Sequence, residues 1–246
     1  MRFLLSLVYW AWFVGVLLVL FPLCVLLWAA TRPFDRRGVV LHRFTSWWGW
    51  LYTWPNPAWP VTIEHRERLD DAETYVIVAN HQSLLDILVL FRIFAHFRWV
   101  SKIENFRIPL VGGVMYMNRY IPLSRGRRES TLRMMDACRE SLNAGTSVLL
   151  FPEGTRSETS EMRPFKSGAF ELARRTRRPL LPIAIEGTSR ALPKRGFVLR
   201  GKHPITIRIL DALPPAAFET LSSQELGLHV RELIAREIER MRAESA

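Results

Sequence analysis

The sequence predicts an α/β fold, with helices flanking a mostly parallel central sheet, preceded by an N-terminal membrane-embedded segment of two helices. Three observations support this fold class. Residues 3–31 contain no charged side chain, residues 39–59 are rich in tryptophan, and strand-like stretches alternate with helix-like stretches after residue 60. We therefore expect a membrane-anchoring helical segment over residues 1–60 and an α/β domain over residues 61–246.

The first apolar segment is long enough to cross a membrane. A helix from Phe3 to Thr31 exceeds a hydrocarbon core of about 30 Å, and it is too long and too rich in tryptophan for a signal peptide. Pro22 predicts a kink in this helix. If the helix spans, the excess of arginine after it places the rest of the chain on the cytoplasmic side of the cytoplasmic membrane. Arg2 precedes the segment, and the arginines that follow it are Arg32, Arg36, Arg37 and Arg43.

The second segment, Val39 to Trp59, has the composition of a helix at a membrane surface. Besides His42 and Arg43 it contains Trp47, Trp48, Trp50, Tyr52, Trp54 and Trp59. Aromatic rings settle at the level of the lipid headgroups. Either the first helix spans the bilayer and the second lies in the interface, or both form a shallow hairpin in one leaflet, which Pro22 and the polarity of the second segment favour. A buried helical hairpin of a soluble protein is the remaining alternative.

Composition restricts the classes of partner. The 246 residues are 49% hydrophobic and carry a net charge of +11, which suits nucleic acid, an anionic membrane surface or acidic substrates. No zinc finger or RNA-recognition signature is visible, so we expect no nucleic-acid partner and favour anionic lipid. Cys24 and Cys138 lie in segments of different kind, which predicts no disulfide and a reducing compartment. No spacing of cysteine and histidine predicts a metal site.

A linker that contains Pro55, Pro57 and Pro60 separates the two parts, and the elements after it follow the order of an α/β domain. Strands are expected at Thr74–Ala79, Arg98–Ser101, Met115–Ile121, Ser147–Phe151, Leu181–Ile185 and Ile205–Leu210. Helices are expected at Leu84–Phe97, Glu129–Asn143, Lys166–Arg174 and Gln224–Arg242. Because loops gather at the carboxyl ends of parallel strands, we expect the functional site at that edge of the sheet.

The loop after the first expected strand contains a histidine and an aspartate, His81 and Asp86. An imidazole takes a proton from an alcohol near neutral pH when an acceptor holds its other nitrogen, and Asp86 could curl back across the helix start to do so. Ser83 between them is better suited to capping the helix, and the chain has no G-x-S-x-G elbow, so the nucleophile is expected to be the substrate's own hydroxyl. The alternative is that His81 caps the helix and Asp86 faces solvent.

A second polar loop, Phe151-Pro152-Glu153-Gly154-Thr155-Arg156-Ser157, ends another apolar stretch. Gly154 permits close backbone approach, and Arg156 offers a planar fork matched to phosphate oxygens. Glu153 is suited to position this arginine or an incoming hydroxyl. The alternative is an ordinary surface turn with a solvated ion pair.

Further cations follow other expected elements. Lys102 follows one strand, Arg119 ends the next, and Lys166 opens a helix, where a helix N-terminus and a cation together bind phosphate. Taken singly, each of these side chains is more simply explained as a solvated charge. The cluster of Arg125, Arg127 and Arg128 is interpreted as a solvated face that can also contact anionic headgroups.

These motifs, in this order, resemble the glycerolipid acyltransferase family, the lysophosphatidic acid acyltransferases in particular. The resemblance covers roughly residues 75–190 and rests on four blocks. The blocks are N-H-x-x-x-x-D at Asn80–Asp86, a glycine-then-arginine block at Gly113–Arg119, F-P-E-G-T-R-S at 151–157 and a proline-containing strand at Leu181–Ile185. The second block departs from the commoner family form at Met115, Met117 and Asn118.

The resemblance implies a role for each residue. His81 would deprotonate the acceptor hydroxyl, Asp86 would orient His81, and the hydroxyl would attack an acyl thioester on acyl-CoA or acyl-carrier protein without an acyl-enzyme, a cofactor or a metal. The cations Lys102, Arg119 and Arg156 would hold the acceptor phosphate, with Glu153, Gly154 and Thr155 shaping the loop, and Lys166 is a weaker candidate.

The resemblance therefore implies an enzyme that acylates the sn-2 hydroxyl of 1-acylglycerol 3-phosphate to give phosphatidic acid in phospholipid biosynthesis. Residues 61–246 would be its acyltransferase domain, and membrane lipids its partners. One alternative is an acyltransferase for another lyso-lipid, such as lysophosphatidylglycerol or a lyso-ornithine lipid. Another is a catalytically inactive, membrane-anchored lipid-binding protein. A hydrolase is disfavoured because no covalent nucleophile is evident.

Overall fold

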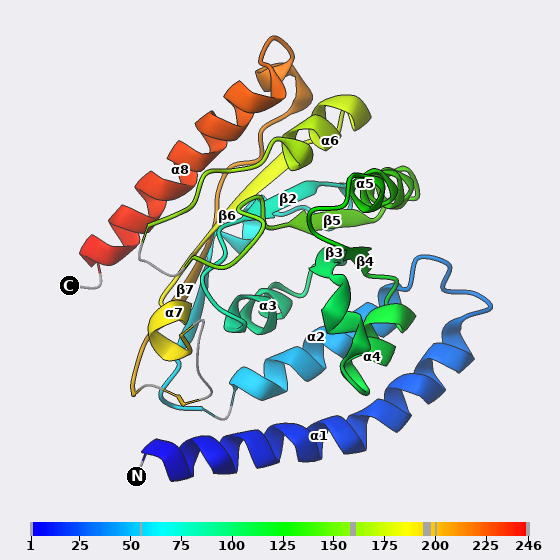
Figure 1. Ribbon diagram of the computed structural model, residues 1–246, viewed down its shortest axis with the longest axis vertical. Coiled ribbons are helices and arrows are strands. Elements are labelled where there is room, and N and C mark those ends of the chain that lie inside the picture. The colour runs from blue at the N-terminus through cyan, green and yellow to red at the C-terminus, as the bar shows by residue number, and fades with distance from the viewer. Residues whose placement is uncertain (1, 55, 158–160, 194–197, 200, 245–246) are drawn as a thin grey trace.

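The computed structural model describes residues 2–54, 56–157, 161–193, 198–199 and 201–244. In this part of the chain seven strands form one sheet in the order β1-β7-β6-β2-β5-β3-β4 (Figure 1). The strands are β1 (Val61–Glu64), β2 (Val76–Ala79), β3 (Phe97–Lys102), β4 (Ile121–Leu123), β5 (Ser147–Leu150), β6 (Leu180–Glu186) and β7 (Ile205–Ile209). Only β6 and β7 pair antiparallel among these neighbours, which confirms the predicted α/β fold with a mostly parallel sheet.

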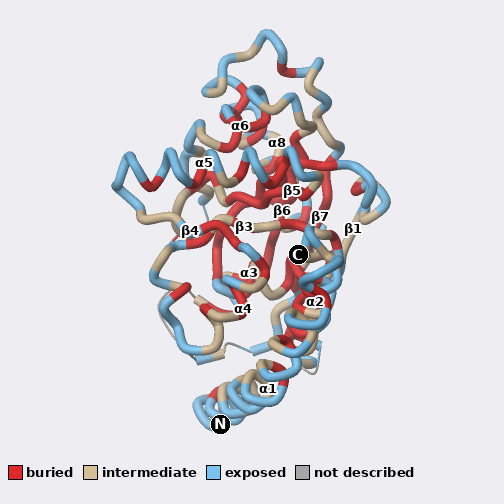
Figure 2. Tube along the Cα trace, turned by 90° about the vertical axis from the view of Figure 1, so that its right-hand side faces the viewer, coloured by how far each residue is buried: buried red, intermediate tan, exposed pale blue. Residues whose placement is uncertain are grey.

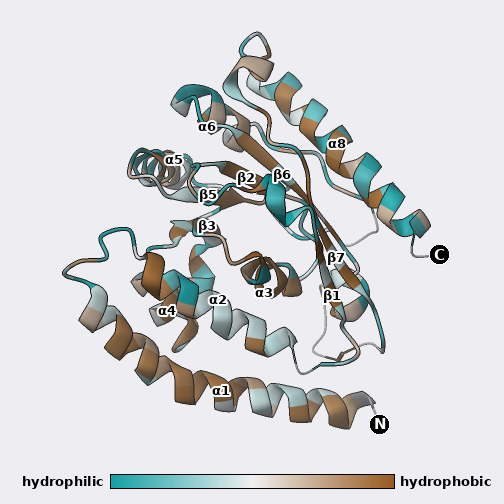
Figure 3. Cartoon of the chain, turned by 180° about the vertical axis from the view of Figure 1, so that it is seen from behind, coloured by the Kyte–Doolittle hydropathy of each residue, from teal (hydrophilic) through white to brown (hydrophobic). Residues whose placement is uncertain are grey.

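Helices cover both faces of the sheet (Figures 1 and 3). One face carries α5 (Arg128–Asn143), α6 (Gly168–Thr176) and α8 (Ser223–Glu244). The other face carries α2 (Val39–Thr53), α3 (Leu85–Leu90) and α4 (Val111–Met117), with α1 (Arg2–Thr31) outside them, and α7 (Thr188–Ala191) follows β6. The central strand β2 is apolar throughout because Ile77 and Ala79 pack into one core while Val76 and Val78 pack into the other.

The two N-terminal helices differ in burial. Within the described residues α1 is the helix long and apolar enough to cross a membrane, and it runs unbroken through Pro22 with most of its surface exposed (Figure 2). In contrast, α2 lies between α1 and the domain, and its Gly49 faces the ring of Phe91, where a Cβ would lie 2.5 Å from a ring carbon. Trp48 and Tyr52 on α2 are buried. The segment Val39–Trp59, which was predicted to lie at a membrane surface, is therefore partly buried within the protein.

Two predicted elements are wrong in their bounds. The expected strand Met115–Ile121 is the end of α4 followed by a turn, and β4 begins only at Ile121. An apolar run with two glycines fits a buried helix as well as a strand, and periodicity alone does not separate the two. The expected helix Leu84–Phe97 ends early, because a 3-10 turn follows α3 and Phe94 adopts a left-handed φ of 52° that leads the chain into β3.

Candidate active site

The histidine and aspartate that follow β2 form a buried pair at the carboxyl edge of the sheet. Nδ1 of His81 lies 2.7 Å from Oδ2 of Asp86, whose side chain is fully buried, whereas the His81 side chain is 11% exposed. A carboxylate accepts only, so Nδ1 carries the shared proton and Nε2 is left with the lone pair of a general base. The ring of Phe151 stacks on the imidazole with centroids 4.1 Å apart. The alternative in which Asp86 faces solvent is thereby excluded.

The Asp86 carboxylate accepts further hydrogen bonds. Its Oδ2 accepts the backbone N–H groups of Gln82 at 2.7 Å and Ser83 at 2.9 Å, and its Oδ1 accepts the Thr188 hydroxyl at 2.5 Å. Such a set of donors stabilises the anion and fixes its orientation. The Ser83 hydroxyl donates to the carbonyl of Leu192 at 2.6 Å, so it is engaged away from His81. The N-cap of α3 is Leu84 and no side chain caps the helix there, so the predicted capping role of Ser83 is wrong.

The second loop is bonded to the first through Glu153. Its Oε1 accepts the backbone N–H of His81 at 2.7 Å and its Oε2 accepts that of Arg163 at 2.9 Å, while the Ser157 N–H donates to the His81 carbonyl at 2.9 Å. Burial raises the pKa of Glu153, and these two hydrogen bonds oppose the shift. Glu153 therefore positions the main chain of His81, rather than the arginine or the incoming hydroxyl that the sequence suggested.

Several cations lie at the same edge. Lys102 ends β3 and pairs with Glu104 at 3.2 Å. Burial lowers the pKa of the Arg156 guanidinium, attraction to the Asp86 carboxylate opposes this, and repulsion from Arg125 adds to it, so Arg156 lies within electrostatic range of both Asp86 and Arg125.

Lys166 reaches across the turn that contains Gly154, Thr155 and Arg156. Gly154 has a φ of 72°, and a Cβ there would lie 2.9 Å from Nζ of Lys166. The Lys166 N–H also donates to the Pro152 carbonyl at 2.9 Å. Lys166, the weaker candidate from the sequence, thus lies directly against the loop that contains Arg156.

Arg119 lies elsewhere, which corrects the prediction that it helps to hold the phosphate. It precedes β4, which runs parallel to β3, so it lies at the amino edge of the sheet, opposite His81. Its guanidinium donates to the carbonyl of Arg36 at 2.7 Å, in the connection between α1 and α2. There it bonds this connection to the domain.

Arg125 is the cation that sequence reasoning assigned to a solvated face. It comes two residues after β4 ends, at the carboxyl edge, and its own pKa is lowered by burial and raised by the nearby Glu104 carboxylate. The available signal was its position directly after an apolar strand, which is also the position of His81 and Arg156. The site cations at this edge are thus Lys102, Arg125, Arg156 and Lys166.

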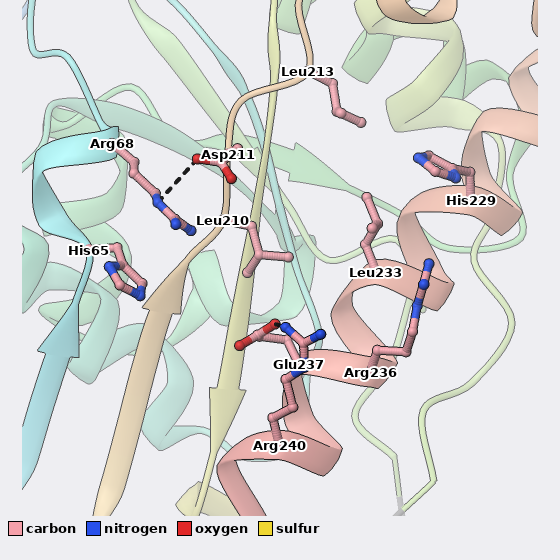
Figure 4. A pocket seen from close by; sticks show the side chains of 10 residues that line it. All are labelled: His65, Arg68, Leu210, Asp211, Leu213, His229, Leu233, Arg236, Glu237 and Arg240. Atoms are coloured by element: carbon pink, nitrogen blue, oxygen red, sulfur yellow. Dashed lines mark hydrogen bonds and ion pairs between the residues drawn. The ribbon is translucent and has the colours of Figure 1, made fainter.

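A groove of about 430 Å³ lies apart from this site, between α8 and the chain that leaves β1 and β7 (Figure 4). Since β7 runs antiparallel to β6, the carboxyl ends of β1 and β7 are at the sheet edge opposite His81. Arg68 and Arg240 in this groove pair with Asp211 and Glu237. Within the described residues, no three His, Cys, Asp or Glu side chains gather as metal ligands.

A parallel α/β sheet with a buried histidine–aspartate pair beside a group of cations is an arrangement suited to activating a hydroxyl group for group transfer. Residues 60–186, more than half of the chain, match the family model described as Acyltransferase. The chain belongs to this acyltransferase family.

Individual relatives agree with this assignment. The chain is 35% identical over 212 residues, 85% of its length, to a 1-acyl-sn-glycerol-3-phosphate acyltransferase of Chlamydomonas reinhardtii. It is 39% identical over 138 residues, 56% of its length, to the chloroplastic LPAT1 enzyme of the same name from Arabidopsis thaliana. The matched regions span 63% and 39% of those two proteins, so the chain spans about half the length of the curated relatives it matches.

A solved structure shows the same fold. The crystal structure of the 1-acyl-sn-glycerophosphate acyltransferase PlsC from Thermotoga maritima aligns with a TM-score of 0.79 at 24% identity. The alignment covers 99% of this chain and 98% of that one, so the N-terminal helices are included in the similarity.

Proposed function

We propose that the protein transfers a fatty acyl group from an acyl thioester to the sn-2 hydroxyl of 1-acylglycerol 3-phosphate, giving phosphatidic acid for phospholipid biosynthesis. The observation that carries the proposal is the pairing of His81 Nδ1 with buried Asp86, which leaves Nε2 as a base beside the Arg156 loop. The names of the curated relatives support the same acceptor.

In this reaction Nε2 of His81 removes the proton of the sn-2 hydroxyl as its oxygen forms a bond to the thioester carbonyl carbon. The tetrahedral intermediate collapses with cleavage of the carbon–sulfur bond, and the imidazolium returns the proton to the leaving thiolate. Asp86 stabilises the imidazolium between the two proton transfers. Lys102, Arg125 and Arg156 hold the acceptor phosphate at a fixed distance from the base.

The proposed setting is the cytoplasmic membrane, with the catalytic domain facing the cytoplasm. The exposed apolar surface of α1 supports contact with the bilayer in which the acceptor resides. The proposed donor is acyl-CoA or acyl-carrier protein, each of which carries the acyl group as a thioester.

The test is an acyl-transfer assay on the purified full chain in detergent, with lysophosphatidic acid as acceptor and a panel of acyl-CoA and acyl-carrier-protein donors. We expect turnover by the wild type and loss of about 10²- to 10⁴-fold in His81→Ala. Parallel assays with lysophosphatidylglycerol and a lyso-ornithine lipid separate the acceptors. Faster turnover of either one, or binding of the acceptor without turnover, would overturn the proposal.

A further inference from the structure

We propose that Thr188 is a positioning residue for the histidine–aspartate pair, acting through Asp86 from the corner between β6 and α7. The inference rests on the proposed acyl transfer and deepens it. Thr188 is fully buried, and its hydroxyl lies 2.5 Å from Oδ1 of Asp86, 102 positions away in the chain. It lies outside all four sequence blocks that carry the family resemblance.

The contact matters because of how the two carboxylate oxygens divide their partners. Oδ2 of Asp86 faces His81 and two backbone N–H groups, whereas Thr188 is the donor described for Oδ1. A buried anionic oxygen without a donor is costly, and a carboxylate free to rotate could present either oxygen to the imidazole. The Thr188 hydroxyl therefore holds Oδ2 toward Nδ1 and the imidazole toward the substrate.

The corner is built to deliver this hydroxyl. Gly187 has a φ of 95°, and a Cβ there would lie 2.1 Å from the carbonyl oxygen of Pro204, so the turn requires glycine. The Asn80 side chain pairs with both backbone groups of Ile185 at 2.8 Å, donating to its carbonyl and accepting its N–H. The end of β6 is thus fixed to the loop of His81 just before the threonine.

Neighbouring contacts extend this attachment. Glu186, the last residue of β6, is buried and accepts the Gln82 side chain at 3.4 Å and the Arg242 guanidinium of α8 at 3.1 Å. The Ser189 hydroxyl donates to the Gln82 side-chain oxygen at 3.2 Å. Among these contacts, only Thr188 reaches the Asp86 carboxylate itself, so its removal tests the positioning role specifically.

A structural role in capping α7 does not explain the threonine. The residue at the N-cap is Gly187, and no side chain caps the helix there. The Thr188 hydroxyl is directed to Asp86, and because it is fully buried it does not contact substrate.

The test compares Thr188→Val, which keeps the shape and removes the donor, with Thr188→Ser, which keeps the donor. We expect Thr188→Val to lower kcat about 10- to 100-fold with an unchanged KM for lysophosphatidic acid, and Thr188→Ser to stay within about threefold of wild type. Thr146→Val is the matched control, since Thr146 is as deeply buried but precedes β5 at the opposite edge, and its activity should equal wild type.

A second measurement separates positioning from general destabilisation. In the Asp86→Asn background, adding Thr188→Val should change kcat by less than about twofold, because the two side chains act as one unit. Full activity of Thr188→Val, a failure of serine to restore kcat, or additive losses in the double variant would each overturn the inference. If the wild type transfers no acyl group to any acceptor, the proposed function fails instead.

Discussion

Glu153 and His81 are joined through the main chain, because one carboxylate oxygen of Glu153 accepts the His81 N–H at 2.7 Å. The same carboxylate accepts the N–H of Arg163 on the far side of the loop. The sequence block that supplies Arg156 therefore also fixes the backbone from which the imidazole projects. The backbone of His81 and the loop that carries Arg156 are held at a constant separation as a result.

Replacing Glu153 with glutamine tests this connection. The amide oxygen satisfies one of the two backbone N–H groups, while the amide NH2 faces the other, so we expect a loss of about 1–3 kcal/mol in unfolding free energy. We also expect kcat to fall with an unchanged acceptor KM, measured by steady-state kinetics beside the exposed control Glu171→Gln. A rise in KM alone would show that the carboxylate contacts the substrate.

Arg125 and Arg119 lie at opposite edges of the sheet and should behave differently. Removing a charge-assisted contact to the phosphate in Arg125→Ala should lower kcat/KM for lysophosphatidic acid about 10- to 100-fold, mainly through KM. Arg119→Ala should leave KM within about twofold of wild type, because this side chain bonds Arg36 instead. A larger rise in KM for Arg119→Ala than for Arg125→Ala would show that Arg119, and not Arg125, contacts the phosphate.

Gly154 and Gly126 offer a matched pair of substitutions. Both have left-handed φ values, 72° and 79°, so alanine at either should cost about 1–2 kcal/mol in unfolding free energy. A Cβ at Gly126 meets nothing within 4 Å, whereas one at Gly154 meets Lys166. Only Gly154→Ala should therefore also lower kcat/KM for the phosphate-bearing acceptor. Equal kinetics for the two variants would mean that Lys166 does not act in the site.

A buried histidine, His42, and a partly buried one, His96, predict a pH dependence of stability. Nε2 of His42 lies 3.1 Å from the Ala95 carbonyl and Nδ1 lies 3.2 Å from the Tyr120 hydroxyl, an arrangement that suits the neutral ring. Burial lowers the pKa of His42 to about 3 and that of His96 to about 4, with repulsion between neighbouring cations adding to both shifts.

The sign follows from proton counting. Below an unfolded pKa of about 6.5 the unfolded state takes up protons that the folded state refuses, so the unfolding free energy falls as the pH falls, by about 1.4 kcal/mol per pH unit for each histidine. Denaturant unfolding in detergent between pH 7.5 and 5.0 measures the slope. Glu153, with its raised pKa, acts in the opposite direction, so the comparison is made between the wild type and His96→Gln. The variant should show the shallower slope, and equal slopes would refute the assignment.

Much of the fold could be predicted because the central strands are buried on both faces. Such strands must be apolar throughout, and the stretches around Val76–Ala79, Ser147–Leu150 and Leu180–Glu186 carry that signal. The stretch ending at Met117 carries the same signal yet forms a helix, since an apolar run that is buried all round can be either element. The strand β1 at the sheet edge was not predicted, because it is only four residues long.

The candidate site was predictable only where its contacts are local. His81 and Asp86 are five residues apart on one turn, so their pairing could be expected from spacing. The contact of Asp86 with Thr188 depends on β6 lying beside β2, which no spacing reveals. Arg125 was not predicted as a site residue for a related reason. Its position at the carboxyl edge of the sheet depends on where α4 ends and β4 begins.

The attachment of Arg242 to Glu186 has a practical consequence for recombinant work. The guanidinium lies in the last turn of α8, and through Glu186 and Gln82 it is linked to the backbone beside the proposed base. An affinity tag fused immediately after this helix would disturb the contacts that join Arg242, Glu186 and Gln82. We therefore expect a tag separated by a flexible Gly/Ser spacer to preserve specific activity better than a direct fusion.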